Sequence, residues 1–147
     1  MNNKFLKMAL AGLVLSVIGF ANATLIGDNV DCNISAGGSF TCSLSTNTLV
    51  EPGIEFYVGG GDVISVDIGA SVVDFEFLVG GSLSATIINL TDLNWIDMPL
   101  GEIVGFSLNN VAGINDFLSA NVSFSAHSLS VDLIGTSFMQ VHQYQYY

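Results

Sequence analysis

The stretch Val63–Val79, which reads VISVDIGASVVDFEFLV, gives the clearest indication of the fold of this chain. Its apolar side chains recur at every second position on both sides of a short Gly-Ala-Ser break, and they are Ile64, Val66, Ile68, Val73, Phe75, Phe77 and Val79. Successive strand side chains point to opposite faces of a sheet, so the stretch predicts two strands, each with one buried and one solvated face. β-branched and aromatic residues suit such a half-buried surface.

The same period of two recurs along most of the chain. Short alternating runs are separated by turns rich in glycine, and they predict strands at 28–34, 40–44, 54–58, 82–90, 103–108, 121–126 and 128–134. We expect a long loop at 109–118, with at most one helical turn, and no amphipathic helix after residue 23. Short strands at this spacing predict an all-β protein, an antiparallel β-sandwich.

The N-terminus has the pattern of a secretory signal peptide. Lys4 and Lys7 precede an apolar run at 8–20, and a small-x-small site, Ala-Asn-Ala, ends at Ala23. We expect cleavage between Ala23 and Thr24 and leave residues 1–23 out of the fold. The run of about 13 residues is shorter than the roughly 20 that a spanning helix needs, so no membrane anchor should remain after cleavage.

These signals divide the chain into three parts. They are a signal peptide at 1–23, a β-sandwich domain at 24–136, and a C-terminal tail or last edge strand at 137–147. Both basic residues lie in the first part, so the processed chain has no lysine or arginine but keeps all 13 acidic residues. Binding to nucleic acid or to anionic lipid requires basic side chains, and the composition therefore excludes both classes of partner.

The two cysteines, Cys32 and Cys42, flank an Ala-Gly-Gly turn at 36–38. A hairpin around this turn would place Cys32 opposite Cys42 and Ile34 opposite Phe40. In an exported chain we expect these cysteines to form one disulfide, with two free buried thiols as the alternative. The spacing of the cysteines, with only two histidines in the chain, does not fit a zinc site.

Catalytic chemistry has little support. The only histidines are His127, in a predicted hairpin turn, and His142, in the tail, and no G-x-S-x-G or H-E-x-x-H motif occurs. Asp74 and Glu76 share a strand face, as a glycosidase pair could, but that face is the solvated one. We expect no enzyme activity, no catalytic residue and no cofactor.

Two binding functions stay open as alternatives. Asp28 with Asp31, or Asp62 with Asp67, could supply oxygen ligands to calcium, although no repeated calcium-loop motif is present and we assign no metal site. Trp95 could stack on a sugar together with Tyr57, but a single tryptophan between apolar neighbours is expected to pack at an edge of the core.

Several segments together resemble the extracellular β-domain of bacterial PEP-CTERM proteins, which exosortases sort. The segments are TLIGD at 24–28, the cysteine pair, EPGIEF at 51–56, VDIGAS at 66–71, LTDLNW at 90–95 and VSF at 122–124. The resemblance implies a β-domain without enzymatic role that a Gram-negative bacterium secretes or displays at its surface, in a biofilm or exopolysaccharide matrix. The chain ends in QYQYY without the Pro-Glu-Pro motif, so we do not expect exosortase sorting.

The sequence thus predicts a secreted, acidic structural protein whose partner is unknown and could be exopolysaccharide or cell-surface matrix. The runner-up is a polymerising, pilus-like surface subunit. It rests on the alternating tail with Tyr146 in the penultimate position, which resembles a strand that adds to the sheet of a neighbouring subunit.

Overall fold

The computed structural model describes residues 12–18, 24–36, 40–44, 46–59, 63–83, 85–96 and 101–138. The strands are β1 (Gly12–Ile18), β2 (Asn29–Ser35), β3 (Thr48–Leu49), β4 (Ile54–Val58), β5 (Ile64–Ile68), β6 (Val72–Phe77), β7 (Gly81–Ser82), β8 (Ile87–Thr91), β9 (Gly105–Ala112), β10 (Ile114–Asn115), β11 (Val122–Ser125), β12 (Ser128–Asp132) and β13 (Ser137–Phe138). One 3-10 helical turn, η1 (Ser119–Asn121), precedes β11.

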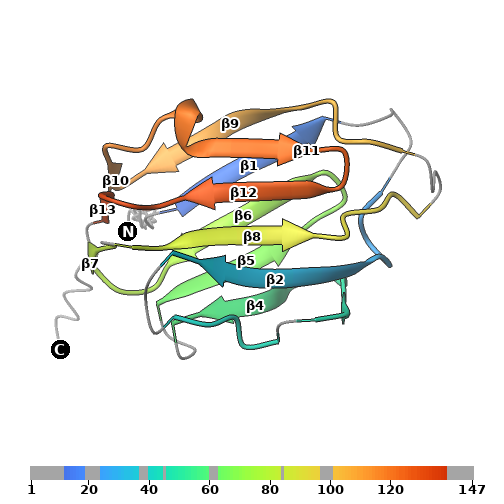
Figure 1. Ribbon diagram of the computed structural model, residues 1–147, viewed down its shortest axis with the longest axis horizontal. Coiled ribbons are helices and arrows are strands. Elements are labelled where there is room, and N and C mark those ends of the chain that lie inside the picture. Colours follow the sequence, from blue (N-terminus) through green and yellow to red (C-terminus); the bar gives the residue numbers. More distant parts are fainter. Residues whose placement is uncertain are drawn as a thin grey trace, which may run out of the picture.

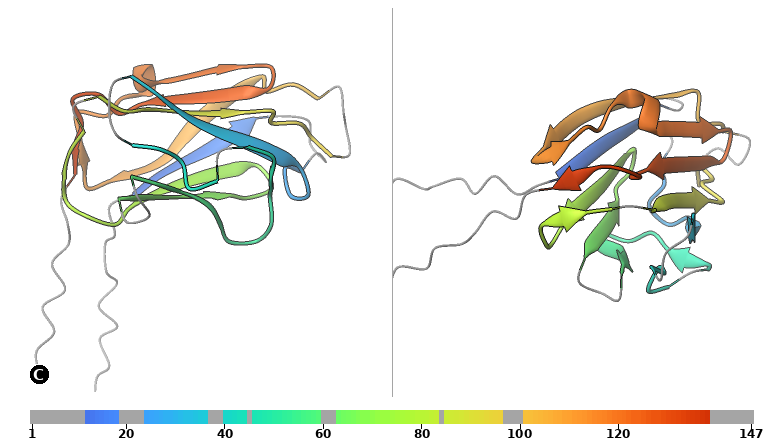
Figure 2. Two further views of the ribbon diagram at one scale, coloured as in Figure 1. Left: turned by 60° about the horizontal axis from the view of Figure 1, so that its bottom comes forward. Right: turned by 60° about the vertical axis from the view of Figure 1, so that its left-hand side comes forward.

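Two five-stranded antiparallel sheets make up the body of the molecule (Figure 1). One has the order β4-β5-β6-β1-β9 and the other the order β11-β12-β8-β2-β3. Figure 2 shows the two layers from the side, with the orange β11 and the red β12 in one and the blue β1 and green β6 in the other. A small third sheet, β10-β13-β7, lies at one end. The predicted all-β antiparallel sandwich is confirmed.

The stretch Val63–Val79 forms β5 and β6, as predicted. The two strands pair antiparallel with Val66 opposite Phe75 and Ile68 opposite Val73. Both strands bury their alternate apolar residues, so Phe75 is 1% exposed and Val66 is fully buried. Val79 is the exception, because it is 37% exposed. It lies beyond the end of β6 at Phe77, so the alternation of buried and solvated side chains does not reach it.

Residues 12–18 contradict the expectation that the whole N-terminal segment lies outside the fold. They form β1, which pairs antiparallel with β6 on one side and with β9 on the other. The inward side chains Leu13, Leu15 and Val17 are buried, and Leu13 and Leu15 are fully buried. An apolar run with a serine at its centre suits a strand inside a sandwich as well as it suits a signal peptide, and the structure uses it as a strand.

Other strand boundaries differ from the prediction. The run at 82–90 divides into β7, in the small sheet, and β8, in the second large sheet. The strand predicted at 103–108 begins at Gly105 and continues to Ala112, so much of the predicted loop at 109–118 is strand. The final hairpin is confirmed, since β11 pairs with β12 from Val122 opposite Val131 to Ser125 opposite Ser128.

The core fills the space between the two sheets. Its largest fully buried members come from both layers and from the loop after β8, and they are Trp95, Phe56, Phe75, Leu13, Leu15, Leu25, Ile64, Ile68, Ile88, Leu90, Leu93 and Leu129. Non-directional burial of apolar area is the main stabilising force in a domain of this size. The N-terminal strand therefore contributes to the same core as the strands that the alternating pattern identified.

Candidate functional site

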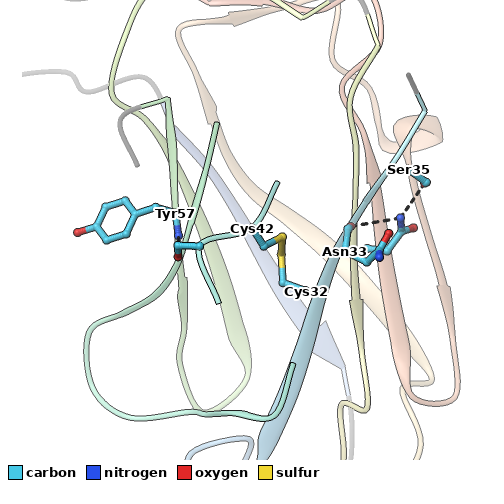
Figure 3. The surroundings of a disulfide bond; sticks show 7 residues. Cys32, Asn33, Ser35, Cys42 and Tyr57 are labelled. Atoms are coloured by element: carbon cyan, nitrogen blue, oxygen red, sulfur yellow. Dashed lines mark hydrogen bonds between the residues drawn. A yellow bond between two sulfur atoms is a disulfide. The ribbon is translucent and has the colours of Figure 1, made fainter. Parts of the chain in front are cut away.

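The disulfide between Cys32 and Cys42 joins the two layers of the sandwich (Figure 3). Cys32 is in the middle of β2, and its Cα lies 6.0 Å from that of Cys42, within the usual range for a disulfide. Cys42 lies beside the other sheet, where it forms an isolated bridge with Val58 of β4. The predicted cysteine pair is thus present, and no described cysteine is free.

The hairpin that was expected to hold this disulfide is wrong. β2 pairs with β3 and β8, not with the segment around Cys42. That segment instead contacts β4, because the backbone N–H of Ser43 donates to the carbonyl of Tyr57 and the Tyr57 N–H donates back to the Ser43 hydroxyl. The disulfide therefore crosses the core between two sheets.

Removal of this disulfide should destabilise the protein by about 2–4 kcal/mol, because the reduced unfolded chain has more freedom. The change is the double substitution Cys32→Ala and Cys42→Ala, and chemical denaturation of both proteins measures the effect. Reduction of the native protein should give a similar loss. Equal stability of the double variant and the native protein would show that the link between the layers contributes nothing.

Two acidic side chains lie inside the structure, where they hold loops in place. The Glu55 carboxylate, 7% exposed, accepts from the N–H of Ile68 at 2.6 Å and from the N–H of Glu51 at 3.1 Å. Asp28 accepts from the N–H of Asn94 at 2.6 Å. Burial raises the pKa of both carboxyl groups, and the hydrogen bonds partly offset this rise.

In the strand predicted at 54–58, Ile54, Phe56 and Val58 alternate with Glu55 and Tyr57, which would place Glu55 on the solvated face, but the structure buries it. A register shift in the pairing of β4 with β5, between Ile54 and Phe56, turns Glu55 inward and leaves Ile54 exposed. Such a bulge interrupts the period of two. No feature of the sequence marks it, apart from the Pro-Gly turn just before.

Of the two proposed calcium pairs, the structure describes both members only of Asp28 with Asp31. Asp28 accepts from the backbone of Asn94, while Asp31 accepts from the N–H of Asn47. Asp67 lies in β5, but Asp62 lies outside the described residues, so the second pair stays a prediction. Within the described ranges, no three His, Cys, Asp or Glu side chains are placed to hold a metal ion.

Three carboxylates form an acidic stripe on the outer face of the first sheet. Asp67 of β5 lies directly opposite Asp74 of β6, and Glu76 is two residues further along β6. We call Asp67, Asp74 and Glu76 the outer acidic stripe. Partial burial raises the pKa of Asp67, and partial burial together with repulsion from Asp67 raises the pKa of Asp74. Like charges directly opposite on neighbouring strands destabilise a sheet.

These raised pKa values give stability a defined pH dependence. The folded chain holds protons on Asp28, Glu55, Asp67 and Asp74 at pH values where the unfolded chain has released them. Their favourable contribution is complete below the unfolded pKa values and is lost as the pH rises through the higher folded values. We therefore expect a higher melting temperature near pH 4.5 than at pH 7.

Asp67→Asn should raise stability at pH 7 by about 0.5 kcal/mol and reduce the pH dependence, because it removes the repulsion with Asp74. The exposed Glu102→Gln is the matched control. Thermal unfolding at both pH values measures the effect. A melting temperature that rises steadily from pH 4.5 to pH 7 would have the wrong sign for these pKa shifts.

The structure describes three of the remaining candidate residues, His127, Trp95 and Tyr57. His127 lies in the turn between β11 and β12, as expected, and His142 lies outside the described residues. Trp95 is 1% exposed, so it packs in the core and cannot serve as a stacking platform with the half-buried Tyr57. Of the predicted cleavage site, Ala23 lies outside the described residues, and the hydroxyl of Thr24 accepts from the N–H of Ile26.

Neutral polar side chains form a row on the outer face of the second sheet, which the sequence did not predict. The amide of Asn89, on the central strand β8, donates to the Ser35 hydroxyl at 2.8 Å and accepts from the Ser130 hydroxyl at 2.8 Å. The Asn89 side-chain nitrogen also lies 3.4 Å from the carbonyl oxygen of Asn33. Figure 3 labels Asn33 and Ser35, and its dashed lines mark the hydrogen bonds that these two residues accept. We call Asn33, Ser35, Asn89 and Ser130 the polar ladder. The alternation of each strand predicts a polar face, but not which strands are neighbours.

A shallow hollow of about 260 Å³ lies between β3 and β4. Its lining includes the exposed Leu49 and Ile54 together with Glu51 and Glu55. Both glutamates line this hollow. The Glu55 carboxylate already accepts two backbone hydrogen bonds, so its role there is structural. The hollow is thus a surface depression next to a structural carboxylate.

The chain matches no family model, no curated protein and no solved structure. In the described part of the chain, no helix has the length and apolar character to cross a membrane. The functional proposal therefore rests on the polar ladder, the disulfide and the charge of the chain.

Proposed function

We propose that this protein is a secreted, non-enzymatic structural protein whose β-sandwich associates with extracellular polysaccharide matrix at a bacterial surface. The proposal includes cleavage of the leader after Ala23. The observation that carries it is the polar ladder, where amide and hydroxyl groups are held in fixed positions across three neighbouring strands. Neutral donors and acceptors on a rigid sheet suit hydrogen bonding to the hydroxyl groups of a glycan.

Two further features support an extracellular structural role. A disulfide that crosses the core persists in an oxidising environment and is rare in the cytosol. Residues 24–147 contain 13 acidic side chains and no basic ones, so the processed protein would repel other copies of itself and remain dispersed until a matrix binds it.

The test has two parts, each with its own readout. Mass spectrometry of protein recovered from cells that carry the gene should find a chain that starts at Thr24 and has its disulfide formed. Co-sedimentation with purified exopolysaccharide should recover the native protein, and it should recover much less of an Asn89→Leu variant. Thr91→Leu, an exposed change on the same strand outside the ladder, is the control. Equal recovery of both variants and the native protein would overturn the matrix role.

A further inference from the structure

The position of β1 within the first sheet is the feature that the proposed function leaves unexplained. β1 lies between β6 and β9, with Leu13 opposite Phe75 on one side and Leu15 opposite Leu108 on the other. Both neighbours use their backbone groups to pair with it. Loss of β1 would leave two unpaired strand edges and expose the core that Leu13, Leu15 and Val17 cover. We call this position between β6 and β9 the β1 slot.

The sequence predicts that this strand is removed, whereas the structure includes it in the core. The basic start, the apolar run and the Ala-Asn-Ala site predict that residues 1–23 are removed, while the fold uses residues 12–18 as an inner strand. An open groove inside a sandwich is unfavourable in water, because its apolar walls are exposed and its two strand edges are unpaired. A strand from another source would restore both kinds of contact in the processed chain.

We propose that, in the processed chain, the β1 slot is the docking site for an extended strand of another exported polypeptide. The inference rests on the proposed cleavage after Ala23. Addition of a strand to open sheet edges is a known mode of peptide recognition, in which the main chain gives affinity and alternate side chains give specificity. β1 itself shows what the slot accepts, since it fills the position with seven residues antiparallel to both neighbours.

The inner wall of the slot specifies the inward side chains of the partner strand. Leu13, Leu15 and Val17 occupy three alternate positions, and each is buried against the core. A partner strand needs aliphatic side chains at the same three positions. A charge at the central one would be buried without a counter-ion, which is strongly unfavourable.

The outer acidic stripe specifies the outward side chains. Val14 lies opposite Asp74, which itself lies opposite Asp67, and Gly12 lies opposite Glu76. A lysine or arginine of the partner strand at either place would lie beside carboxylates that now repel one another. Residues 24–147 contain no basic residue, so a second processed copy cannot supply this charge. The charge pattern therefore favours a different polypeptide with a basic, aliphatic strand.

The experiment begins with the full chain, folded with β1 in place. A specific protease site is inserted between Ala23 and Thr24, the folded protein is cut, and the leader fragment is exchanged in mild denaturant for a fluorescent peptide with the sequence of residues 11–19. Fluorescence anisotropy and native mass spectrometry measure uptake. We expect one peptide per chain, with the melting temperature of the uncut protein restored.

Variant peptides test each side of the slot. A Leu15→Asp peptide should not bind. A Val14→Lys peptide should bind about two- to fivefold more tightly than the parent at low salt, and a Val14→Glu peptide should bind more weakly. At high salt, the parent, Val14→Lys and Val14→Glu peptides should bind with similar affinity. Asp74→Asn in the protein should remove most of the tighter binding of the Val14→Lys peptide.

Several results would overturn the inference. Equal uptake of the parent and Leu15→Asp peptides would show that the slot does not select its inner side chains. A folded fragment 24–147 that takes up no peptide would show that its own residues close the sheet, and oligomers that exclude the peptide would show that a second copy fills it. These results are independent of the proposed function, because the mass of the exported chain and matrix binding are measured separately.

Discussion

Replacement of Phe75 by alanine is expected to lower the free energy of unfolding by about 3–5 kcal/mol. Phe75 lies in the middle of β6, is 1% exposed, and has Val66 opposite on β5 and Leu13 opposite on β1. The substitution removes the apolar area of the ring and leaves a cavity that neighbours on both strands cannot fill without moving. A domain is typically stable by only 5–15 kcal/mol, so the variant should be close to unfolding.

Urea denaturation at fixed pH measures this loss, with Glu76→Ala as the matched control on the next residue of the same strand. Glu76 points to the outer face, so its replacement should change stability by less than about 0.5 kcal/mol. A loss below about 1 kcal/mol for Phe75→Ala would mean that the two faces of β6 are assigned the wrong way round.

Leu15→Ala in the full, uncut chain is expected to cost about 2–5 kcal/mol. Leu15 is fully buried and lies opposite Val73 of β6 and Leu108 of β9. The prediction separates two descriptions of the N-terminal run. If residues 12–18 are a strand of the sandwich, the substitution leaves a cavity in the core. If they are only a leader outside the fold, the same substitution leaves the stability of the domain unchanged.

Val14→Ala is the matched control for this second prediction, because Val14 lies on the outer side of β1 and is only half-buried. Its loss should be clearly smaller than that of Leu15→Ala. Both variants are prepared from refolded full-length protein, so that an effect on export does not enter the measurement. Equal, negligible losses at both positions would contradict the placement of β1 in the sheet.

The alternating pattern predicted what is local. Two strands in 63–79, the hairpin around His127 and the burial of Trp95 follow from side-chain period and turn residues over a few positions, and the structure has all three. The disulfide partners were also predictable, since the chain has only two cysteines. Each of these features depends on residues that are close in sequence or have no alternative partner.

Features that depend on which strands are neighbours were not predictable. The turn predicted at 36–38 made a hairpin the simplest interpretation for Cys32 and Cys42. In the structure, β2 pairs with β8, and Cys42 pairs with Val58 of the other sheet. The polar ladder requires β2, β8 and β12 side by side, although they are far apart in the chain. The run at 8–20 was ambiguous in itself, because its apolar residues meet the demands of a leader and of an inner strand alike.

Hydrogen exchange of backbone amides in the full chain tests whether β5, β6 and β1 lie consecutively in one sheet with a common buried face. The amides of these strands that donate within the sheet should exchange slowly and with similar free energies of opening, since they belong to one cooperative core. Rapid exchange in residues 12–18 while residues 64–77 stay protected would contradict the position of β1. Rapid exchange throughout both segments would contradict the sandwich itself.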